Sequence, residues 1–388
     1  MRIALRATRY NRCSLPALAS VLQTELGAPV SASCRIVLSP LDFLPSDLIV
    51  YSFCTAESPN AAQELSSLRS SFGPALLAIA GGPHPSACPE QVLQMGFRWV
   101  ARGEAGPAFA QLVRDVISGR PPAPGIIGQQ PAPDLDRYAP WPSTPALFAP
   151  LEISRGCPMR CTYCQTPALF GRRMRHRSPA ALAPVLRQAV DAGHTFTRFI
   201  SPNAFAYGSA DGHSAEPRSI EELLLAARAS GMSRVFLGTF PSEVRPESVT
   251  AELLSIVGDL CDNRTIAVGL QSGSPHVLQR IARGHTVQQG LSAVAAIARA
   301  GFEPRVDVMV GIPGETDADR RSTCEMLAHI IDEYGARAHV HAFIPLPGTP
   351  LATSRPAAVD EATLEFLQDR LGRGHILGVK RRGPWTRV

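Results

Sequence analysis

The chain has 388 residues, of which 45% are hydrophobic and 18% are charged, and its formal net charge is +5 at pH 7. This length predicts two or three domains with hydrophobic cores. No run of about 18 apolar residues is present, so we expect no membrane span, and the polar N-terminus lacks a secretory signal, so we expect a cytoplasmic protein. No dense basic block occurs, and no nucleic-acid partner is predicted.

Residues 1–120 alternate between strand and helix patterns. The continuous apolar run at 47–53 is typical of a strand that is buried on both faces of a parallel sheet. Similar strands are expected at 2–7, 75–82 and 97–104, and helices are expected at 15–26, 60–72, 89–96 and 106–119. This alternation predicts a Rossmann-like, doubly wound α/β domain of about five strands.

A proline-rich segment at 121–148 follows, and it predicts an extended linker because proline disfavours both helices and central strands. From residue 149 to residue 350 the alternation resumes through about six βα units. Right-handed crossovers would curl these units into a partial (β/α)6, TIM-like barrel. Residues 351–388 are expected to form a C-terminal helical extension and a basic tail.

Three cysteines, Cys157, Cys161 and Cys164, lie in one loop with C-x3-C-x2-C spacing, directly after a predicted strand. Clustered thiols in a reducing compartment indicate metal binding or redox chemistry. A zinc site usually has four protein ligands, whereas three thiolates leave one iron of a four-iron cluster without a protein ligand. Such an iron can bind a substrate or cofactor. A zinc loop and an accidental cluster of thiols are the alternatives.

The cysteine loop, with Tyr163 before its last cysteine, resembles the signature of the radical S-adenosylmethionine (SAM) superfamily. The resemblance implies that the three cysteines hold a [4Fe-4S] cluster and that SAM chelates the fourth iron. It further implies reductive cleavage of SAM to a 5′-deoxyadenosyl radical that abstracts a hydrogen atom from a substrate. An electron donor such as a flavodoxin or a ferredoxin would be needed.

Two later segments continue the resemblance. In "VGLQSGS" and "LQRIARGHT", Gln271 and Arg283 match residues that contact the amino-acid part of SAM. A guanidinium suits this role because it can bind a carboxylate through two hydrogen bonds. In "VDVMVGIPGET", the backbone of Gly311, Ile312 and Pro313 would lie beside the adenine, and Asp307 would contact the ribose.

Two strand ends complete the expected SAM site. "PSEVRP" resembles the end of the third strand, which implies that Ser242, Glu243 and Arg245 face the site. Many members carry a Gly-Gly-Glu type of turn after the second strand, but this chain has "FISPNAF" there. Ser201 and Asn203 are therefore the proposed replacements.

The N-terminal segment "AIAGGPHPSACPEQVLQMGFRWVARGE" resembles cobalamin (B12)-binding domains that precede radical SAM domains. The resemblance implies that three loops hold the cofactor, through Ser52, Thr55, Gly81, Gly82, His84, Gly103 and Glu104. The D-x-H-x-x-G motif, whose histidine binds cobalt from below, is absent, so we expect no lower axial histidine. A Rossmann-like domain that binds nothing is the alternative.

The most specific interpretation is a cobalamin-dependent radical SAM enzyme that methylates an unactivated carbon of an unknown small-molecule or peptide substrate. Cys13, Cys54 and Cys88 suggest an alternative, since the methylthiotransferases of tRNA and ribosomal protein hold a second cluster on three N-terminal cysteines. The residues around these thiols do not match that family, and its β-rich RNA-binding domain is not evident, so we expect the thiols to be mostly buried. A non-catalytic iron–sulfur or corrinoid-binding protein is the third interpretation.

Overall fold

The computed structural model describes residues 1–27, 33–128, 132–143 and 147–377. The chain divides into two compact units, which are described separately. The first unit comprises Met1–Leu151, Ala168–Phe170 and Ala180–His194, and the second comprises Glu152–Pro167, Gly171–Pro179 and the residues from Thr195 onward. Among the described residues, none of the helices combines the length and the apolar character that crossing a membrane requires.

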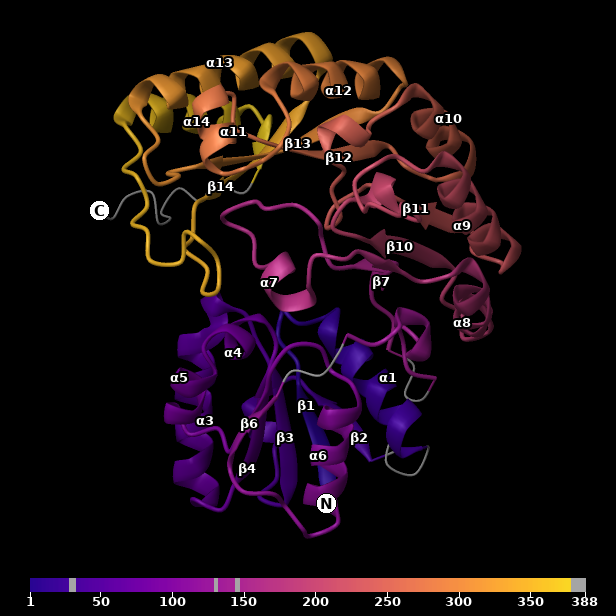
Figure 1. Cartoon of the computed structure of the whole chain (residues 1–388), viewed down its shortest axis with the longest axis vertical. Helices are drawn as coiled ribbons and strands as arrows, with labels where there is room; N and C mark the ends of the chain where they lie inside the picture. The colour runs from indigo at the N-terminus through magenta and orange to yellow at the C-terminus, as the bar shows by residue number, and fades with distance from the viewer. Residues whose placement is uncertain (28–32, 129–131, 144–146, 378–388) are drawn as a thin grey trace. The chain divides into compact units, whose positions relative to one another are not determined.

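The first unit contains a six-stranded parallel sheet with the order β2-β1-β3-β4-β5-β6 (Figure 1). Its strands are β1 (Arg2–Arg6), β2 (Cys34–Val37), β3 (Asp47–Ser52), β4 (Leu77–Gly81), β5 (Trp99–Ala101) and β6 (Gly125–Ile127). The order reverses between β1 and β3, and such a switch point opens a crevice at the carboxyl ends of the strands. The predicted doubly wound fold is therefore confirmed.

Helices cover both faces of this sheet, which explains why β3 is buried at every position. On one face, α1 (Ser14–Leu26) and α6 (Pro107–Ile117) pack against Leu48 and Val50 of β3. On the other face, α3 (Ser58–Phe72) and α5 (Pro89–Gln94) pack against Ile49 and Tyr51. The short helix α4 (Pro83–Ala87) directly follows β4.

The sheet has six strands where about five were expected, and neither of the short outer strands, β2 and β6, was among the ranges expected from the sequence. β6 lies within the segment predicted to be an extended linker, and it pairs with β5 as the last strand of the sheet. None of its three residues is buried, and Ile126 is exposed, so no buried apolar pattern marks the strand. An edge position also tolerates the surrounding prolines better than a central one.

The second unit is built on two sheets whose helices α9, α10, α12 and α13 lie along the outside of the strands (Figure 1). One sheet has the order β11-β10-β7 and the other has the order β12-β13-β14-β15. An isolated parallel bridge joins Val244, in the segment after β11, to Val268 of β12. This arrangement is the predicted partial barrel, interrupted between β11 and β12.

The strands of this barrel are β7 (Leu151–Glu152), β10 (Phe196–Ile200), β11 (Arg234–Phe236), β12 (Thr265–Gln271), β13 (Glu303–Val310), β14 (Arg337–Ala342) and β15 (Ile376–Leu377), and an antiparallel pair, β8 (Ser154–Arg155) and β9 (Arg175–His176), lies beside them. The helices of the second unit are α9 (Pro217–Ala229), α10 (Ala251–Leu260), α11 (Pro275–Arg280), α12 (Val287–Arg299), α13 (Asp317–Tyr334) and α14 (Glu361–Gly372). Nearly all of α8 (Pro179–Asp191) and most of α7 (Thr166–Phe170) belong to the first unit.

The C-terminal segment differs in part from its prediction. Helix α14 forms within the predicted extension, but Ile376 and Leu377 then pair with β14 as the strand β15. A strand of two residues is too short to show the alternation of apolar and polar residues from which a strand is predicted. The basic tail at 378–388 lies outside the described residues.

Candidate active site

The cysteine loop begins at Gly156, which has a positive φ of 89° and could not carry a side chain. A Cβ atom there would lie closer than 3.0 Å to the carbonyl oxygen of Arg173. The N–H of Cys157 donates to Gly171 O at 3.1 Å, and the N–H of Thr162 donates to Ile281 O at 3.0 Å. These bonds fix the loop at both ends and thereby present three thiols from one short segment.

Two guanidinium groups reach the buried thiol of Cys161. Arg283 Nη1 lies 3.7 Å from Cys161 Sγ, and Arg245 Nη1 lies 3.9 Å from it. Arg245 also donates to the carbonyl oxygen of Arg283 and to Glu247 Oε1, the latter at 2.5 Å. Two positively charged groups therefore lie beside a sulfur that is predicted to bind iron.

The chemistry of this loop fits an iron–sulfur cluster. Cys157, Cys161 and Cys164 all lie within the loop, and none of them is in a disulfide. Burial raises the pKa of the Cys157 thiol, so metal binding there would have to displace a proton. A four-iron cluster binds each thiolate at a different iron and therefore accepts more widely separated sulfurs than a single ion does.

Three of the residues predicted to bind SAM converge on Gly269 in β12. A Cβ atom at Gly269 would lie closer than 3.0 Å to Glu243 Oε2, Arg283 Nη2 and Gln271 Nε2. Arg283 Nη2 also donates to the carbonyl oxygen of Gly269 at 2.9 Å. Gly269 was missed by the sequence analysis. The absence of a side chain there leaves room for two amide or guanidinium donors and a carboxyl group.

The backbone near these groups adopts an uncommon conformation. Gln271 has φ of 71° and Ala282, which precedes Arg283, has φ of 50°. The pairing of β12 with β13 also shifts register between Gly269 and Gln271, as in a β-bulge. Side chains other than glycine rarely occupy this left-handed region, and such strain often marks a functional site. One of these two residues, Gln271, is a predicted SAM residue, and the other, Ala282, directly precedes one.

A buried carboxyl pair lies beside Arg283. Burial, together with a hydrogen bond to Asp307, raises the pKa of Glu243 well above its usual range. Burial opposes ionisation of Asp307 as well, but hydrogen bonds from Glu243, His339 and His341 lower its pKa. Glu243 is thus the protonated partner, and it donates to the Asp307 carboxylate.

Ser201, Asn203 and Ser242 connect the ends of β10 and β11. Ser242 Oγ donates to Ser201 O at 2.9 Å, and the N–H of Ser201 donates to Ser242 Oγ at 3.0 Å. The N–H of Arg245 donates to Asn203 Oδ1 at 3.1 Å, which positions the guanidinium that reaches Cys161. The Asn203 Nδ2 atom is buried without a hydrogen-bond partner among the described residues.

The turn predicted to lie beside adenine is held by its own neighbours. The N–H of Gly311 donates to Glu315 Oε2 at 2.7 Å, and its carbonyl accepts from the N–H of Ala357 at 2.9 Å. Arg280 Nε donates to Pro313 O at 2.5 Å, and Ile312 is fully buried in an apolar cluster. The turn is ordered by these contacts, and its contact with adenine stays a prediction.

In the first unit, the predicted cobalamin residues are tied to one another. His84 is buried, with Nε2 3.1 Å from Ser58 Oγ and Nδ1 3.3 Å from Thr55 Oγ1. Burial lowers its pKa, so the ring is neutral at pH 7. A Cβ atom at Gly82, where φ is 97°, would lie 2.9 Å from Phe53 N. A cobalt-ligand role for His84 would replace one of these two hydroxyl contacts.

Hydrogen bonds also link the other loops that follow the strands of this sheet. Ser52 Oγ lies 3.0 Å from Ser14 Oγ, and the N–H of Gly103, which Glu104 follows, donates to Ser86 Oγ at 2.9 Å. Asn11, which the sequence analysis missed, donates to Ser52 O at 3.0 Å and so links the loops after β1 and β3. An asparagine near a strand end was the only signal for it.

The expectation that Cys13, Cys54 and Cys88 are mostly buried is wrong. Cys13 is exposed, and Cys54 and Cys88 are intermediate in exposure. Cys13 follows β1 in the chain, Cys54 follows β3 and Cys88 follows β4, and these three strands are adjacent in the sheet. Loops at strand ends leave side chains partly open to solvent, whereas the sheet core does not.

A partial parallel barrel that carries three cysteines beside two arginines defines the class of radical SAM domains. Residues 151–327, a little under half of the chain, match the family model of the Radical SAM superfamily. The resemblance expected from the sequence is therefore confirmed.

Two curated relatives, from different organisms, have the same name. The tRNA-2-methylthio-N(6)-dimethylallyladenosine synthase of Pelobacter propionicus is 31% identical over 245 residues, which cover 60% of this chain and 52% of the relative. That of Acidithiobacillus ferrooxidans is 32% identical over 248 residues, which cover 62% of this chain and 53% of the relative. The chain thus spans about half the length of these relatives.

Two solved structures share the fold across both units. The radical SAM methyltransferase TsrM from Kitasatospora setae, with cobalamin and a [4Fe-4S] cluster bound, has a TM-score of 0.63 at 15% identity and covers 91% of this chain and 74% of its own. The cobalamin-dependent radical enzyme OxsB has a TM-score of 0.61 at 14% identity and covers 96% of this chain and 55% of its own. At these identities the likeness supports the fold.

Proposed function

We propose that this chain is a cobalamin-dependent radical SAM enzyme that transfers a methyl group to an unactivated carbon of a small-molecule or peptide substrate. The observation that carries the proposal is the position of Arg283. Its buried guanidinium is 3.7 Å from Cys161 Sγ and 2.9 Å from Gly269 O, beside Gln271 and Glu243. One residue thus connects the cluster loop with the predicted SAM residues.

In this proposal, Cys157, Cys161 and Cys164 hold the [4Fe-4S] cluster. Bound there, the cluster supplies a single electron and SAM supplies a cleavable carbon–sulfur bond. Arg283 and Gln271 bind and orient the amino-acid part of SAM, and Arg245 contacts Cys161 Sγ. Glu243 keeps its proton and holds Asp307, so this part of the site adds one negative charge instead of two.

The fold of the first unit supports the cobalamin part of the proposal. Its crevice lies at the ends of parallel strands, and Gly82 lets the loop after β4 pack against the loop after β3 without a side chain between them. We propose residues 1–120 as the cobalamin domain, 121–148 as the linker, 149–350 as the radical SAM domain and 351–388 as the extension. A flavodoxin or ferredoxin would supply the electron.

Reconstitution without oxygen tests the iron–sulfur part. The chain should bind about four irons, and added SAM should change the electron paramagnetic resonance spectrum of the reduced cluster. Cys161→Ala should lose most of the iron, while Cys324→Ala, which removes a partly exposed thiol outside the loop, should keep it. Tetrahedral zinc, or a cluster that does not respond to SAM, would contradict the proposal.

A second function is favoured by the curated relatives, whose name describes methylthiolation of tRNA. Cys13, Cys54 and Cys88 follow three adjacent strands, as a second cluster on this edge of the sheet would require. In that case the chain should bind about eight irons. The triple variant Cys13→Ala, Cys54→Ala, Cys88→Ala should then lose half of them. An unchanged iron content in the triple variant, together with corrinoid uptake, favours the first function.

A further inference from the structure

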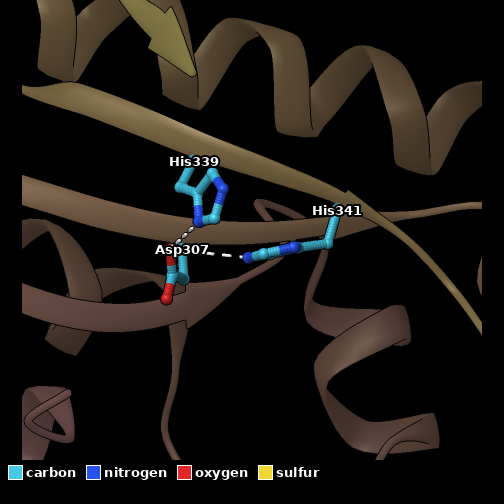
Figure 2. Close-up of side chains that lie close together, drawn as sticks. All are labelled: Asp307, His339 and His341. Atoms are coloured by element: carbon cyan, nitrogen blue, oxygen red, sulfur yellow. Dashed lines mark ion pairs between the residues drawn. The ribbon is translucent and has the colours of Figure 1, made fainter. Parts of the chain in front are cut away.

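Two adjacent strands place a carboxylate and two imidazoles on one face of the second unit. Asp307 of β13 is paired in register with His339 of β14, and Met309 is paired with His341. Alternate residues of a strand point to the same side, so both histidines lie on the side of Asp307. Figure 2 shows both imidazole rings directed at the same carboxyl group.

The distances between the possible ligand atoms of these three side chains are close to those found around a bound metal ion. His339 Nδ1 is 3.4 Å and His341 Nε2 is 3.8 Å from Asp307 Oδ1, and all three ligand atoms lie within 4.8 Å of one another. A tetrahedral ion with bonds of about 2.1 Å holds its ligand atoms ~3.4 Å apart. Small rotations of the two half-exposed rings would reach that geometry.

We propose that Asp307, His339 and His341 bind a divalent first-row transition ion such as Zn(II) or Fe(II). Within the described ranges, this is the one group of three such side chains whose ligand atoms lie so close together. Two imidazoles and one carboxylate are a donor set that zinc and non-haem iron both accept. Three protein ligands leave at least one coordination position open.

The surroundings provide access and orientation. Asp307 and His339 line a cavity of about 970 Å³ within the second unit, together with Thr239, Phe240 and Arg305. The ring of Phe240 meets that of His339 edge-on at 5.8 Å, which limits its rotation. Arg305 would repel a cation, but its guanidinium is paired with Glu303 at 2.5 Å. The open position of the ion would therefore face the cavity.

This assignment gives Asp307 a different role from the ribose contact predicted from the sequence. The ion site contains none of the cluster cysteines, and the proposal does not depend on the proposed methyl transfer. Asp307 is nevertheless hydrogen-bonded to Glu243, which is one of the predicted SAM residues. A bound ion would therefore be connected to the predicted SAM site through its own ligand.

The test uses the reconstituted full chain, incubated with Zn(II) without oxygen and then desalted. After desalting, the wild-type chain should hold one more zinc than either His341→Ala or His339→Ala. The affinity of each variant for Zn(II) should be at least tenfold lower than that of wild type. His329→Ala, which removes an exposed imidazole from α13, should retain zinc like wild type. Iron content near four per chain would show that each variant is folded.

X-ray absorption of the zinc in wild type provides a measurement that needs no variant. Nitrogen and oxygen neighbours at about 2.0–2.2 Å, with an imidazole pattern, are expected. Equal zinc in wild type and the histidine variants, or a first shell dominated by sulfur at about 2.3 Å, would overturn the proposal. Loss of SAM-dependent chemistry with zinc binding intact would contradict only the proposed function.

Discussion

At the scale of single residues, Gly269 and its neighbours define the site. β12 presents Gly269 and Gln271 on the same face, and the missing side chain of Gly269 makes room for Glu243 and Arg283. Three polar groups can share this volume only because no methyl group occupies it. The site is therefore as sensitive to this glycine as to the polar residues around it.

A methyl group at Gly269 should displace the predicted SAM residues. We expect Gly269→Ala to weaken SAM binding at least tenfold while the iron content stays near four per chain. Isothermal titration calorimetry of the reconstituted protein with SAM checks the affinity. The matched control is Gly258→Ala in α10, where the nearest atom to a new Cβ is 3.8 Å away. Unchanged SAM affinity in Gly269→Ala would contradict the described arrangement.

His285 gives a prediction for pH. Burial and the nearby Arg283 lower its pKa to about 4, so the ring is neutral when folded and becomes protonated more easily when unfolded. The unfolded state thus binds more protons as the pH falls from about 6.5 towards 4, and stability is lost in that window. At pH 5 this loss amounts to about 2 kcal/mol relative to pH 7.5.

Urea unfolding of the cluster-free chain at the two pH values checks this effect. Replacing the ring, as in His285→Leu, removes the titrating group, so the variant should lose about 2 kcal/mol less than wild type does between pH 7.5 and 5. All other titrating groups are common to both proteins and cancel in the comparison. Equal losses in the two proteins would show that folding does not lower the pKa of His285.

At the scale of elements, the start of α13 connects two helices. Thr316 caps α13, and Asp319 completes the capping box with its side chain. Asp319 also accepts from Ser274 Oγ at 2.5 Å, at the N-terminus of α11, and lies 3.1 Å from His276 Nδ1. One buried carboxylate therefore holds the position of α11, whose end contacts the cysteine loop through Ile281.

Substitutions at this junction should lower the free energy of unfolding by different amounts. We expect Thr316→Ala to lower the free energy of unfolding by about 1 kcal/mol, as loss of an N-cap usually does. Asp319→Ala should cost about 2 kcal/mol or more, because it also leaves buried donors unpaired. Glu325→Ala, on the exposed side of α13, should stay within about 0.5 kcal/mol of wild type. Chemical denaturation measures all three, and equal costs for the first two would refute the linking role.

At the scale of the whole molecule, the two units suggest two cofactors. The first unit has the switch-point crevice of a doubly wound sheet, and the second has the cysteine loop at the end of a strand. Both positions are those at which parallel α/β architectures bind ligands. The relatives named for tRNA modification span about twice the aligned length, so substrate choice is open to test.

Cobalamin binding should depend on the backbone of the first unit. With cobalamin supplied without oxygen, we expect about one corrinoid per chain. Gly82→Val should reduce uptake severalfold, because its side chain would collide with Phe53 and φ is positive there. His84→Ala should leave the cobalt spectrum unchanged, since the ring is bound to Thr55 and Ser58. A nitrogen signal on cobalt that His84→Ala abolishes would contradict this account.

Local patterns in the sequence were sufficient for much of this description. The continuous apolar run of β3 indicated a parallel sheet, and the C-x3-C-x2-C spacing indicated an open iron, because both signals lie within a few adjacent residues. Gln271 and Arg283 were also paired from the sequence, through a motif of fixed spacing. The short strands β6 and β15 were missed because two or three residues at an edge carry no period.

Contacts between distant segments were beyond these patterns. The sequence does not say that Arg245 reaches Cys161, that Glu243 and Gln271 both approach Gly269, or that Asp307 and His339 are paired in register. Strand pairing alone brings such residues together, across gaps of tens of residues in the chain. Chemistry carried by one loop can therefore be read locally, whereas chemistry shared between strands depends on how the sheet assembles.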